Sequence, residues 1–388
     1  MIRDAVAQYA TRFHRMLGGT HGVASPFGAW LLLALVAPAA TGTRRSSLAE
    51  VLGCDPDEAF VAASRMLHEP HAELVLGAAA WHDPRYETEP LLDFLRRLAA
   101  HADSGPIPSQ AEADAWADER TLGLIERFPL NIDASVVLLL ATAIAAKVSW
   151  YAPFLLAPAD SALLPADPGF GHKPLLRDPG TRAWCGFVQT EVGLLAGYVA
   201  PSTDGLYVTS AIGEPGADPT AVLDATMQLA CGVAGGPRPE PISLYELPLG
   251  DGPAWQITEE TASFIGSPER YEFLLPAWEA TSDHKLLDGE LGFQQAGGAL
   301  IELLPSEGYD LEARQSAMAR YSREGFEAAA VTGLAVRMAA HSPHEGPVRT
   351  ARVEFTRPHA VVAATRGDDE WDGLPVFSAW ITEAVPAE

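Results

Sequence analysis

Two pairs of histidines are the residues best suited to metal chemistry, and their surroundings argue against it. His341 and His344, followed by Glu345, have the same spacing as His68 and His71. A metal site needs ligands that a second layer of hydrogen bonds holds in place. Neither stretch has the pattern of a helix that would supply such support. We therefore predict solvent-exposed histidines in loops, and no bound metal or other cofactor.

Motifs for nucleotide binding and nucleophilic catalysis are missing as well. The glycines in residues 18–22 have neither the spacing of a dinucleotide-binding turn nor the Lys-Ser/Thr of a phosphate-binding loop. The chain has no Gly-x-Ser-x-Gly turn. The sequence therefore offers no catalytic residues, and only a Ser, His and Asp brought together by folding stay open as an alternative.

The balance of charge limits the kinds of partner. The chain has 388 residues, 48% of them hydrophobic, and its 26 Lys and Arg stand against 51 Asp and Glu, for a formal net charge of −25. The apolar share is enough for a large core. Nucleic acids and anionic membranes are bound by clustered Lys and Arg. The charge therefore argues against both as partners.

Nothing in the chain indicates secretion or a membrane span. Residues 1–17 carry charges that interrupt the apolar core that a signal peptide needs. The longest apolar run, residues 30–40, has 11 residues, whereas a bilayer span needs about 20. Cys54, Cys185 and Cys231 are too few and too far apart for a disulfide framework. We expect a soluble, cytoplasmic protein with free, buried thiols.

Helical patterns are concentrated in the first third of the chain. Apolar residues at helical spacing predict a helix over 4–17, and a strongly apolar one begins with Pro26 in its first turn. A short helix over 43–51 ends at Gly53, and an amphipathic helix covers 110–127.

Strand patterns dominate the rest. Residues 136–148 are apolar on both faces and partly β-branched, which predicts a strand buried between two layers, with a buried helix as the alternative. The Pro- and Gly-rich stretch 155–270 predicts antiparallel strands and one helix near 219–231. The strands predicted within this stretch are 194–199, 206–212 and 241–247, and those predicted after it are 309–321, 353–355, 360–365 and 376–382. This is an α+β pattern, with helices early and strands late.

One segment has an unusual composition. Residues 325–333 read Gly-Phe-Glu-Ala-Ala-Ala-Val-Thr-Gly, between a strand-like stretch and about 20 residues of loop character. Small side chains in a row, without helix caps, suit a segment that slides between two strands. The alternative is a short Ala-rich helix, which the glycines at both ends disfavour.

Several motifs in order give the chain a resemblance to a known family. They are Ser25-Pro26-Phe27-Gly28, Val51-Leu52-Gly53, a helix with Trp116, Thr121, Gly123 and Ile125, a strand that ends in Trp150-Tyr151-Ala152-Pro153-Phe154, and Glu354-Phe355-Thr356-Arg357-Pro358-His359. In this order and spacing the chain resembles the serpins over nearly its whole length, as a divergent bacterial-type member.

The resemblance implies the serpin fold. That fold is a single α+β domain, here 1–388, with three β-sheets, eight or nine helices and an exposed reactive-centre loop. Residues 1–130 would form its helical N-terminal part and 131–388 its sheet-rich part, with the hinge and reactive loop at about 324–350. The resemblance also implies a monomer whose partner is a serine protease.

The resemblance implies a mechanism too. Inhibitors of the family offer the loop to a protease, are cleaved to an acyl-enzyme, and insert the loop as a new strand in the central sheet. The hinge is then Gly325, Phe326, Glu327, Ala328, Ala329, Ala330 and Val331. Strand alternation points Phe326, Ala328, Ala330 and Thr332 toward the core. The family usually has Thr at position 326, so Phe326 slows entry, because overpacking costs about 1–3 kcal/mol.

The loop length implied by the resemblance puts the scissile bond between Ala339 and Ala340. A small residue there suits an elastase- or subtilisin-like enzyme. The stretch that follows, 341–352, is longer than in typical members. The bond between Arg349 and Thr350 is therefore a second candidate, for a trypsin-like enzyme.

Two regions depart from the inhibitor pattern. At the shutter beneath the opening strands, next to Ser25, the family has a hydrogen-bonded Ser, Asn and His, and the aligned positions here are Gly28, Thr142 and Gln315. At the breach, near Trp150, the family's Lys–Glu pair corresponds to Ala277 and Arg323. The sequence thus favours a serpin-like protease inhibitor. It leaves open a non-inhibitory serpin-fold protein with a binding role, or a scaffold recruited for small-molecule binding or catalysis.

Overall fold

A computed structural model of the chain describes residues 2–146, 148–158, 161–171, 173–288, 290–305, 308–326 and 344–387. Over these ranges the chain forms eight α-helices: α1 (Ile2–Leu17), α2 (Pro26–Val36), α3 (Gly42–Leu52), α4 (Pro56–His68), α5 (Glu89–Leu98), α6 (Gln110–Arg120), α7 (Pro219–Gly235) and α8 (Phe293–Ile301). None of them is long and apolar enough to cross a bilayer.

A six-stranded sheet forms the centre of the molecule. Its order is β1 (Gly22–Ala24), β19 (Pro375–Ile381), β18 (His359–Thr365), β10 (Leu206–Ile212), β9 (Gly193–Pro201) and β8 (Trp184–Thr190). Every residue of β18 and β19 is buried. Both strands are therefore mostly apolar and have no solvent-facing side, as strands covered on both faces are.

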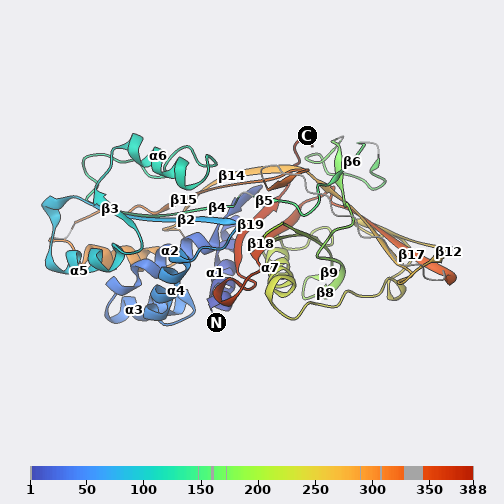
Figure 1. Cartoon of the computed structure of the whole chain (residues 1–388), viewed down its shortest axis with the longest axis horizontal. Helices are drawn as coiled ribbons and strands as arrows, with labels where there is room; N and C mark the ends of the chain where they lie inside the picture. The colour runs from blue at the N-terminus through green and yellow to red at the C-terminus, as the bar shows by residue number, and fades with distance from the viewer. Residues whose placement is uncertain are drawn as a thin grey trace.

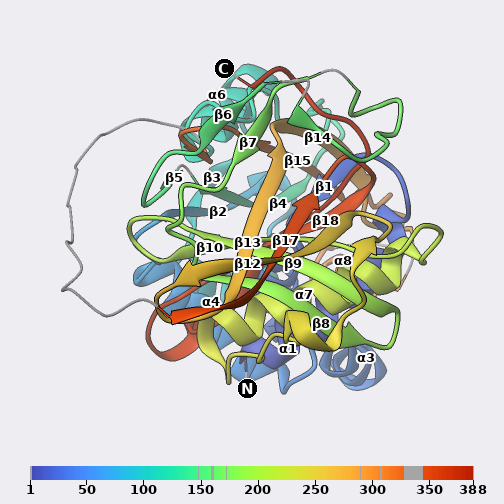
Figure 2. The ribbon, with the colours of Figure 1, turned by 90° about the vertical axis from the view of Figure 1, so that its right-hand side faces the viewer.

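A second six-stranded sheet extends from one end of the body as a long ribbon (Figure 1). Its order is β11 (Gly250–Asp251), β12 (Trp255–Phe264), β17 (His344–Glu354), β13 (Glu269–Pro276), β7 (Leu175–Arg177) and β6 (Leu155–Ala157). β17 is antiparallel to β12 and parallel to β13. Figure 2 shows these three strands side by side from that end of the molecule.

The third sheet is divided. One part is β3 (Asp103–Pro106), β2 (Leu74–His82) and β4 (Leu138–Ala146), and the other is β14 (Trp278–Lys285) and β15 (Arg314–Tyr321). A short pair, β5 (Val148–Ser149) with β16 (Gly325–Phe326), closes one end. In Figure 1 α6 lies on one face of these strands, and α1 to α4 lie on the other. We call the space between β4 and β15 the gap.

The ends of the helices follow from their sequence. Ser25 caps α2, because its hydroxyl accepts from the amide of Gly28, and Pro26 occupies the first turn. α3 ends at Gly53, whose φ of 72° is costly for residues with a side chain. Both ends agree with the sequence prediction.

Several predicted boundaries were wrong, for physical reasons. The helix predicted over 110–127 ends at Arg120, because Leu122 and Gly123 take φ values of 56° and 79°. Residues 241–247 are no strand, since the hydroxyl of Ser243 accepts from the amide of Tyr245 and starts a single 3₁₀ turn, Leu244–Glu246. The stretch predicted as a buried strand, 136–148, does contain one, β4, which covers only Leu138–Ala146. The part predicted as helical, 1–130, also contains β1, β2 and β3.

Candidate functional site

The gap is the candidate site, and it contains a cavity of about 90 Å³. Residues 140–146 of β4 line one side of the cavity and residues 314–318 of β15 line the other. Trp116 and Ala117 of α6 and the following residue, Thr121, cover it, and the start of α2 forms its floor. In the described part of the chain β4 pairs only with β2, and β15 pairs only with β14. The two facing edges therefore leave backbone groups available for another strand.

The shutter positions connect α2 to both sides of the gap. On the β15 side, the carboxamide of Gln315 accepts from the amide of Ser25 at 3.0 Å and donates to its carbonyl at 2.9 Å. On the β4 side, the Thr142 hydroxyl donates to the carbonyl of Gly28 at 3.0 Å. The Ser25 hydroxyl donates to the carbonyl of Val376 at 2.9 Å, which also attaches α2 to β19. The substituted shutter is thus a complete hydrogen-bonded bridge beneath the gap.

The chain reverses direction where β15 meets the predicted hinge. The amide and hydroxyl of Ser322 donate to the carbonyl of Gly325 at 3.0 and 2.8 Å, which closes a turn. Gly325 and Phe326 then run antiparallel to β5, opposite Ser149 and Val148. A Cβ at Gly325 would collide with the carbonyl oxygen of Val148. This position therefore needs glycine.

Aromatic side chains fill the space beneath this turn. The indole of Trp150 donates to the carbonyl of Ser322 at 3.0 Å, and its ring centre lies 4.9 Å from that of Tyr321. Phe154 packs against both rings. Burial raises the pKa of Tyr321 well above its usual value, and its hydroxyl has no hydrogen-bond partner within the described ranges. Trp150 thus lies beneath the turn, and its assignment to the breach stays a prediction from the resemblance.

Among the described residues, neither of the two aligned breach positions forms an ion pair. The guanidinium of Arg323 donates to the carbonyl of Phe154 at 3.1 Å, and the amide of Phe154 donates back to the carbonyl of Arg323 at 2.9 Å. Ala277 forms a backbone bridge to Val385. Backbone hydrogen bonds therefore hold the chain where the family pattern has two charged side chains.

The predicted scissile bonds fall in different places. Ala339, Ala340 and the hinge residues Glu327 to Val331 lie outside the described residues. Arg349 and Thr350 lie within β17 and not in a loop, so the predicted loop boundary at 350 was wrong: the strand begins at His344. Arg349 stands opposite Glu259 of β12 on one side and Glu269 of β13 on the other.

The side chain of Arg349 is held on several sides. It donates to the carboxylate of Glu259 at 2.7 Å and to the carbonyls of Leu244 and Leu247 at 2.7 and 3.0 Å. Its guanidinium lies 4.7 Å from the ring centre of Tyr245, whose hydroxyl donates to the carbonyl of Pro347. Only 15% of its side chain is exposed. Such a residue cannot present itself to a trypsin-like protease.

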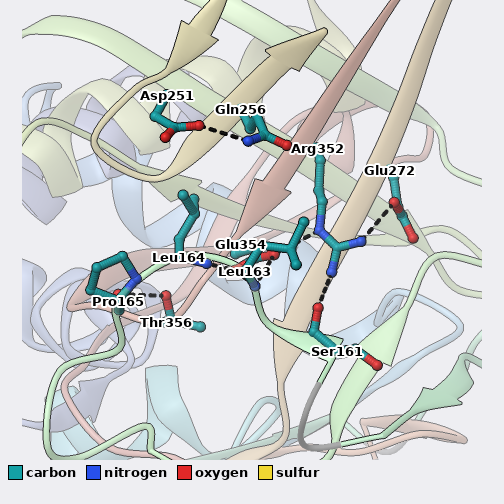
Figure 3. Close-up of polar contacts among 10 residues, drawn as sticks. All are labelled: Ser161, Leu163, Leu164, Pro165, Asp251, Gln256, Glu272, Arg352, Glu354 and Thr356. Carbon is teal, nitrogen blue, oxygen red and sulfur yellow. Dashed lines mark hydrogen bonds and ion pairs between the residues drawn. The ribbon is translucent and has the colours of Figure 1, made fainter.

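A second cluster fixes the other end of β17 (Figure 3). Glu354 is fully buried and accepts from the amides of Leu163 and Leu164, both at 3.0 Å. Arg352 donates to Glu354 at 2.6 Å, to Glu272 at 3.1 Å, and to the carbonyl of Ser161. The buried carboxylate therefore has a charged partner and backbone donors, as buried charges require.

The structure does assemble one Ser–His–Asp set. His14 of α1 has its Nδ1 2.5 Å from Asp224 of α7 and its Nε2 2.9 Å from the hydroxyl of Ser378 on β19. His14 is 0% and Ser378 is 1% exposed. Neither group can reach a substrate, so the set connects two helices to the sheet and is no active centre.

The histidines differ in part from their prediction. His344 is exposed on β17, but His68 is the last residue of α4, and His71 is buried with its ring bonded to the carbonyl of Arg366. No three His, Cys, Asp or Glu within the described ranges are arranged to hold a metal. The three thiols are free and half-buried, and burial raises the pKa of Cys54 and Cys185 to about 11. They are therefore protonated and unreactive at neutral pH.

Comparison with known proteins identifies the architecture. No family model and no curated protein sequence matches the chain. Among solved structures it is similar to Serpin48 of the insect Tenebrio molitor, with 16% identity, a TM-score of 0.62, and 99% of this chain and 98% of that chain covered. The chain has the serpin fold. The native thermophilic serpin tengpin matches at 14% identity and a TM-score of 0.66, over 98% of this chain and 94% of that one.

A third solved structure shows that the fold serves more than one function. Human thyroxine-binding globulin in complex with its hormone matches at 13% identity and a TM-score of 0.62, over 100% of this chain and 99% of that chain. The similar structures thus include proteins named as serpins and a globulin named for its binding of thyroxine. The predicted fold is confirmed, whereas the choice between inhibition and binding depends on the site itself.

Proposed function

We propose that this protein inhibits a serine protease by inserting its cleaved loop into the gap. The observation that carries the proposal is the reversal at Ser322–Gly325. It leaves Gly325 and Phe326 antiparallel to β5, at the mouth of the gap, so they already have the direction of an inserted strand. A chain that continued from Phe326 along β4 would need no further turn.

The register of this short pair defines how insertion would continue. Phe326 is opposite Val148, so in unbroken register Ala328 falls opposite Ala146, Ala330 opposite Ile144, and Thr332 opposite Thr142. Directly opposed residues share one face of a sheet. Ala146 and Val148 belong to the main core, whereas Leu139 and Ala141 face α6. The even-numbered hinge residues therefore enter the core, where alanines fit and charges do not.

Insertion is favourable because it satisfies both free edges. A strand between β4 and β15 would gain about a dozen ladder hydrogen bonds, each worth roughly 0.5–1.5 kcal/mol. The bridge of Ser25, Thr142 and Gln315 opposes separation of the two sides, because its hydrogen bonds join both to α2. Cleavage frees the loop to supply the compensating bonds, and so drives the sheet open.

The protease proposed is elastase- or subtilisin-like, with Ala339–Ala340 as the scissile bond. Both residues are small. The bond between Arg349 and Thr350 is excluded as the scissile bond, because Arg349 lies in β17 and pairs with Glu259. Attack by the serine of the protease would break the peptide bond between Ala339 and Ala340, leave the carbonyl of Ala339 as an ester on that serine, and free the amine of Ala340. Residues 327–336 would then pull the attached protease along as they enter the gap.

A non-inhibitory role is the second candidate, and the breach favours it. The gap-side contacts of Arg323 are backbone hydrogen bonds in place of an ion pair. A breach held by backbone hydrogen bonds must break other contacts than an ion pair before it opens. If the loop then enters the gap too slowly, the acyl-enzyme is hydrolysed and the protein acts only as a substrate. The gap would then serve only as a cavity for a small apolar ligand.

A gel assay with subtilisin, elastase and trypsin tests the proposal. We expect a denaturant-stable complex with one of the first two enzymes and release of a peptide that begins at Ala340, identified by mass spectrometry. Cleavage at that bond with neither complex nor a gain in heat stability would exclude insertion and favour the second candidate.

A further inference from the structure

β17 has neighbours on both of its edges. β12 pairs with it from Trp255, opposite Val353, to Phe264, opposite His344. β13 pairs with it on the other side from Glu269, opposite Arg349, to Leu274, opposite Glu354. An edge strand can leave a sheet by losing one ladder of hydrogen bonds, whereas β17 must lose two.

The segment that provides β12 also covers β17 with side-chain contacts. Residues 236–264 lie between α7 and the turn into β13. Leu244 and Leu247 accept from Arg349, Tyr245 lies beneath its guanidinium, and Glu259 forms its ion pair. Because the side chain of Arg349 is only 15% exposed, its hydrogen bonds to the carbonyls of Leu244 and Leu247 are partly shielded from water, whereas Glu259 and Tyr245 stay partly exposed. We call residues 236–264 the clamp.

The length of the chain determines whether an uncut loop can insert fully while β17 stays in its sheet. To pair with β4 as far as Leu138, the chain must descend from position 326 to 336, about 34 Å for an antiparallel strand. The chain would then have to return from position 336 to His344. These eight residue-to-residue steps span at most about 29 Å, which is shorter than the descent. β17 lies beyond the β5 end of the gap, so the true return path is longer (Figure 1).

We infer that the clamp prevents full insertion of the uncut loop by fixing β17, so that cleavage alone can release the inserting strand. The inference rests on the proposed function, because it concerns the same insertion. The clamp, which no sequence motif marks, thereby controls insertion of the loop. The partner it restrains is β17 of the same chain.

Arg349→Gln is the variant that tests the clamp. Arg96→Gln is the matched control, because Arg96 is 64% exposed and its ion pairs within the described residues are with Glu89 and Asp93 of its own helix. Each uncut protein is incubated a few degrees below its unfolding temperature. Conversion is followed as the fraction that becomes heat-stable while mass spectrometry shows an intact chain. We expect Arg349→Gln to convert about tenfold faster than wild type, and Arg96→Gln to behave as wild type.

A sample cut at the loop separates failure of the clamp from failure of the proposed function. If the cut protein gains heat stability and Arg349→Gln converts no faster than wild type, the clamp inference is overturned and insertion stands. If the cut protein gains no stability, the proposed function fails and the inference falls with it.

Hydrogen exchange on the uncut wild type gives a measurement that needs no variant. The amides of Val348 to Val353 should exchange as slowly as those of β18, since β17 is paired on both edges. Exchange at the rate of an edge strand such as β8 would contradict the clamp.

Discussion

The chain is anchored very differently on the two sides of residues 327–343. On the N-terminal side, the described residues of β16 pair with β5 at two positions, beside a gap whose two edges have no strand partner within the described ranges. On the C-terminal side, β17 is an 11-residue strand with neighbours on both edges and ion pairs at Arg349 and Arg352. This asymmetry means that a cut between the two sides releases one end and leaves the other in place.

The largest expected effect comes from placing a charge on the inserting side. Ala328→Arg should abolish complex formation while leaving cleavage intact, because the register puts position 328 opposite the buried Ala146 and an arginine there must lose its water. Glu327→Arg is the control, since position 327 has the opposite face and already carries a charge. The ratio of complex to cleaved protein on a denaturing gel measures both. An unchanged ratio in Ala328→Arg would refute the register.

Trp150→Ala should be the most destabilising change on the N-terminal side. The buried indole packs on Tyr321 and Phe154, and truncation of a buried Trp costs about 3–5 kcal/mol. Tyr151→Ala, at a side chain that is 60% exposed, should change the free energy of unfolding by no more than about 0.5 kcal/mol. Urea denaturation gives both values. Equal losses would mean that Trp150 does not support the turn.

Arg352→Ala tests the C-terminal side. It removes the charged partner of the buried Glu354 and should lower the free energy of unfolding by about 3 kcal/mol. Arg270→Ala in the same sheet removes an exposed pair with Glu260 and should cost less than about 1 kcal/mol. If the two variants melt alike, the cluster in Figure 3 does not anchor β17.

The sequence could predict those structural features that have local signals. A proline in the first turn and a serine cap place the start of α2, and a run apolar on both faces places β4. These features depend on neighbouring residues, whose effects periodicity and turn chemistry describe.

The clamp could not be predicted, because its partner is distant in the chain. β12 reads Trp-Gln-Ile-Thr-Glu-Glu-Thr-Ala-Ser-Phe, and its polar half shows no alternation that would reveal a buried face. Arg349 seemed suited to a protease because only contacts with residues about 100 positions earlier show that it is held. His71 was misjudged for the same reason, since its partner is Arg366.

The smallest expected effect concerns the speed of entry. Phe326→Thr should raise the yield of complex over cleaved protein a few-fold, because position 326 is opposite the buried Val148, and relief of overpacking is worth about 1–3 kcal/mol. Ala329→Thr, on the other face, serves as the control. Stopped-flow mixing with the protease separates the rate of insertion from that of acylation. A yield equal to that of the control would show that Phe326 imposes no delay.

The helix over the gap bears on the order of events. α6 buries only Ala113 and Ala117, and Trp116 holds it through edge contacts with Trp81 and Phe128. A helix with so little buried surface detaches at low cost, through local unfolding that leaves the rest of the fold intact. A strand can pass beneath it while α6 is lifted, and the helix can return afterwards as a lid that makes the closed state long-lived.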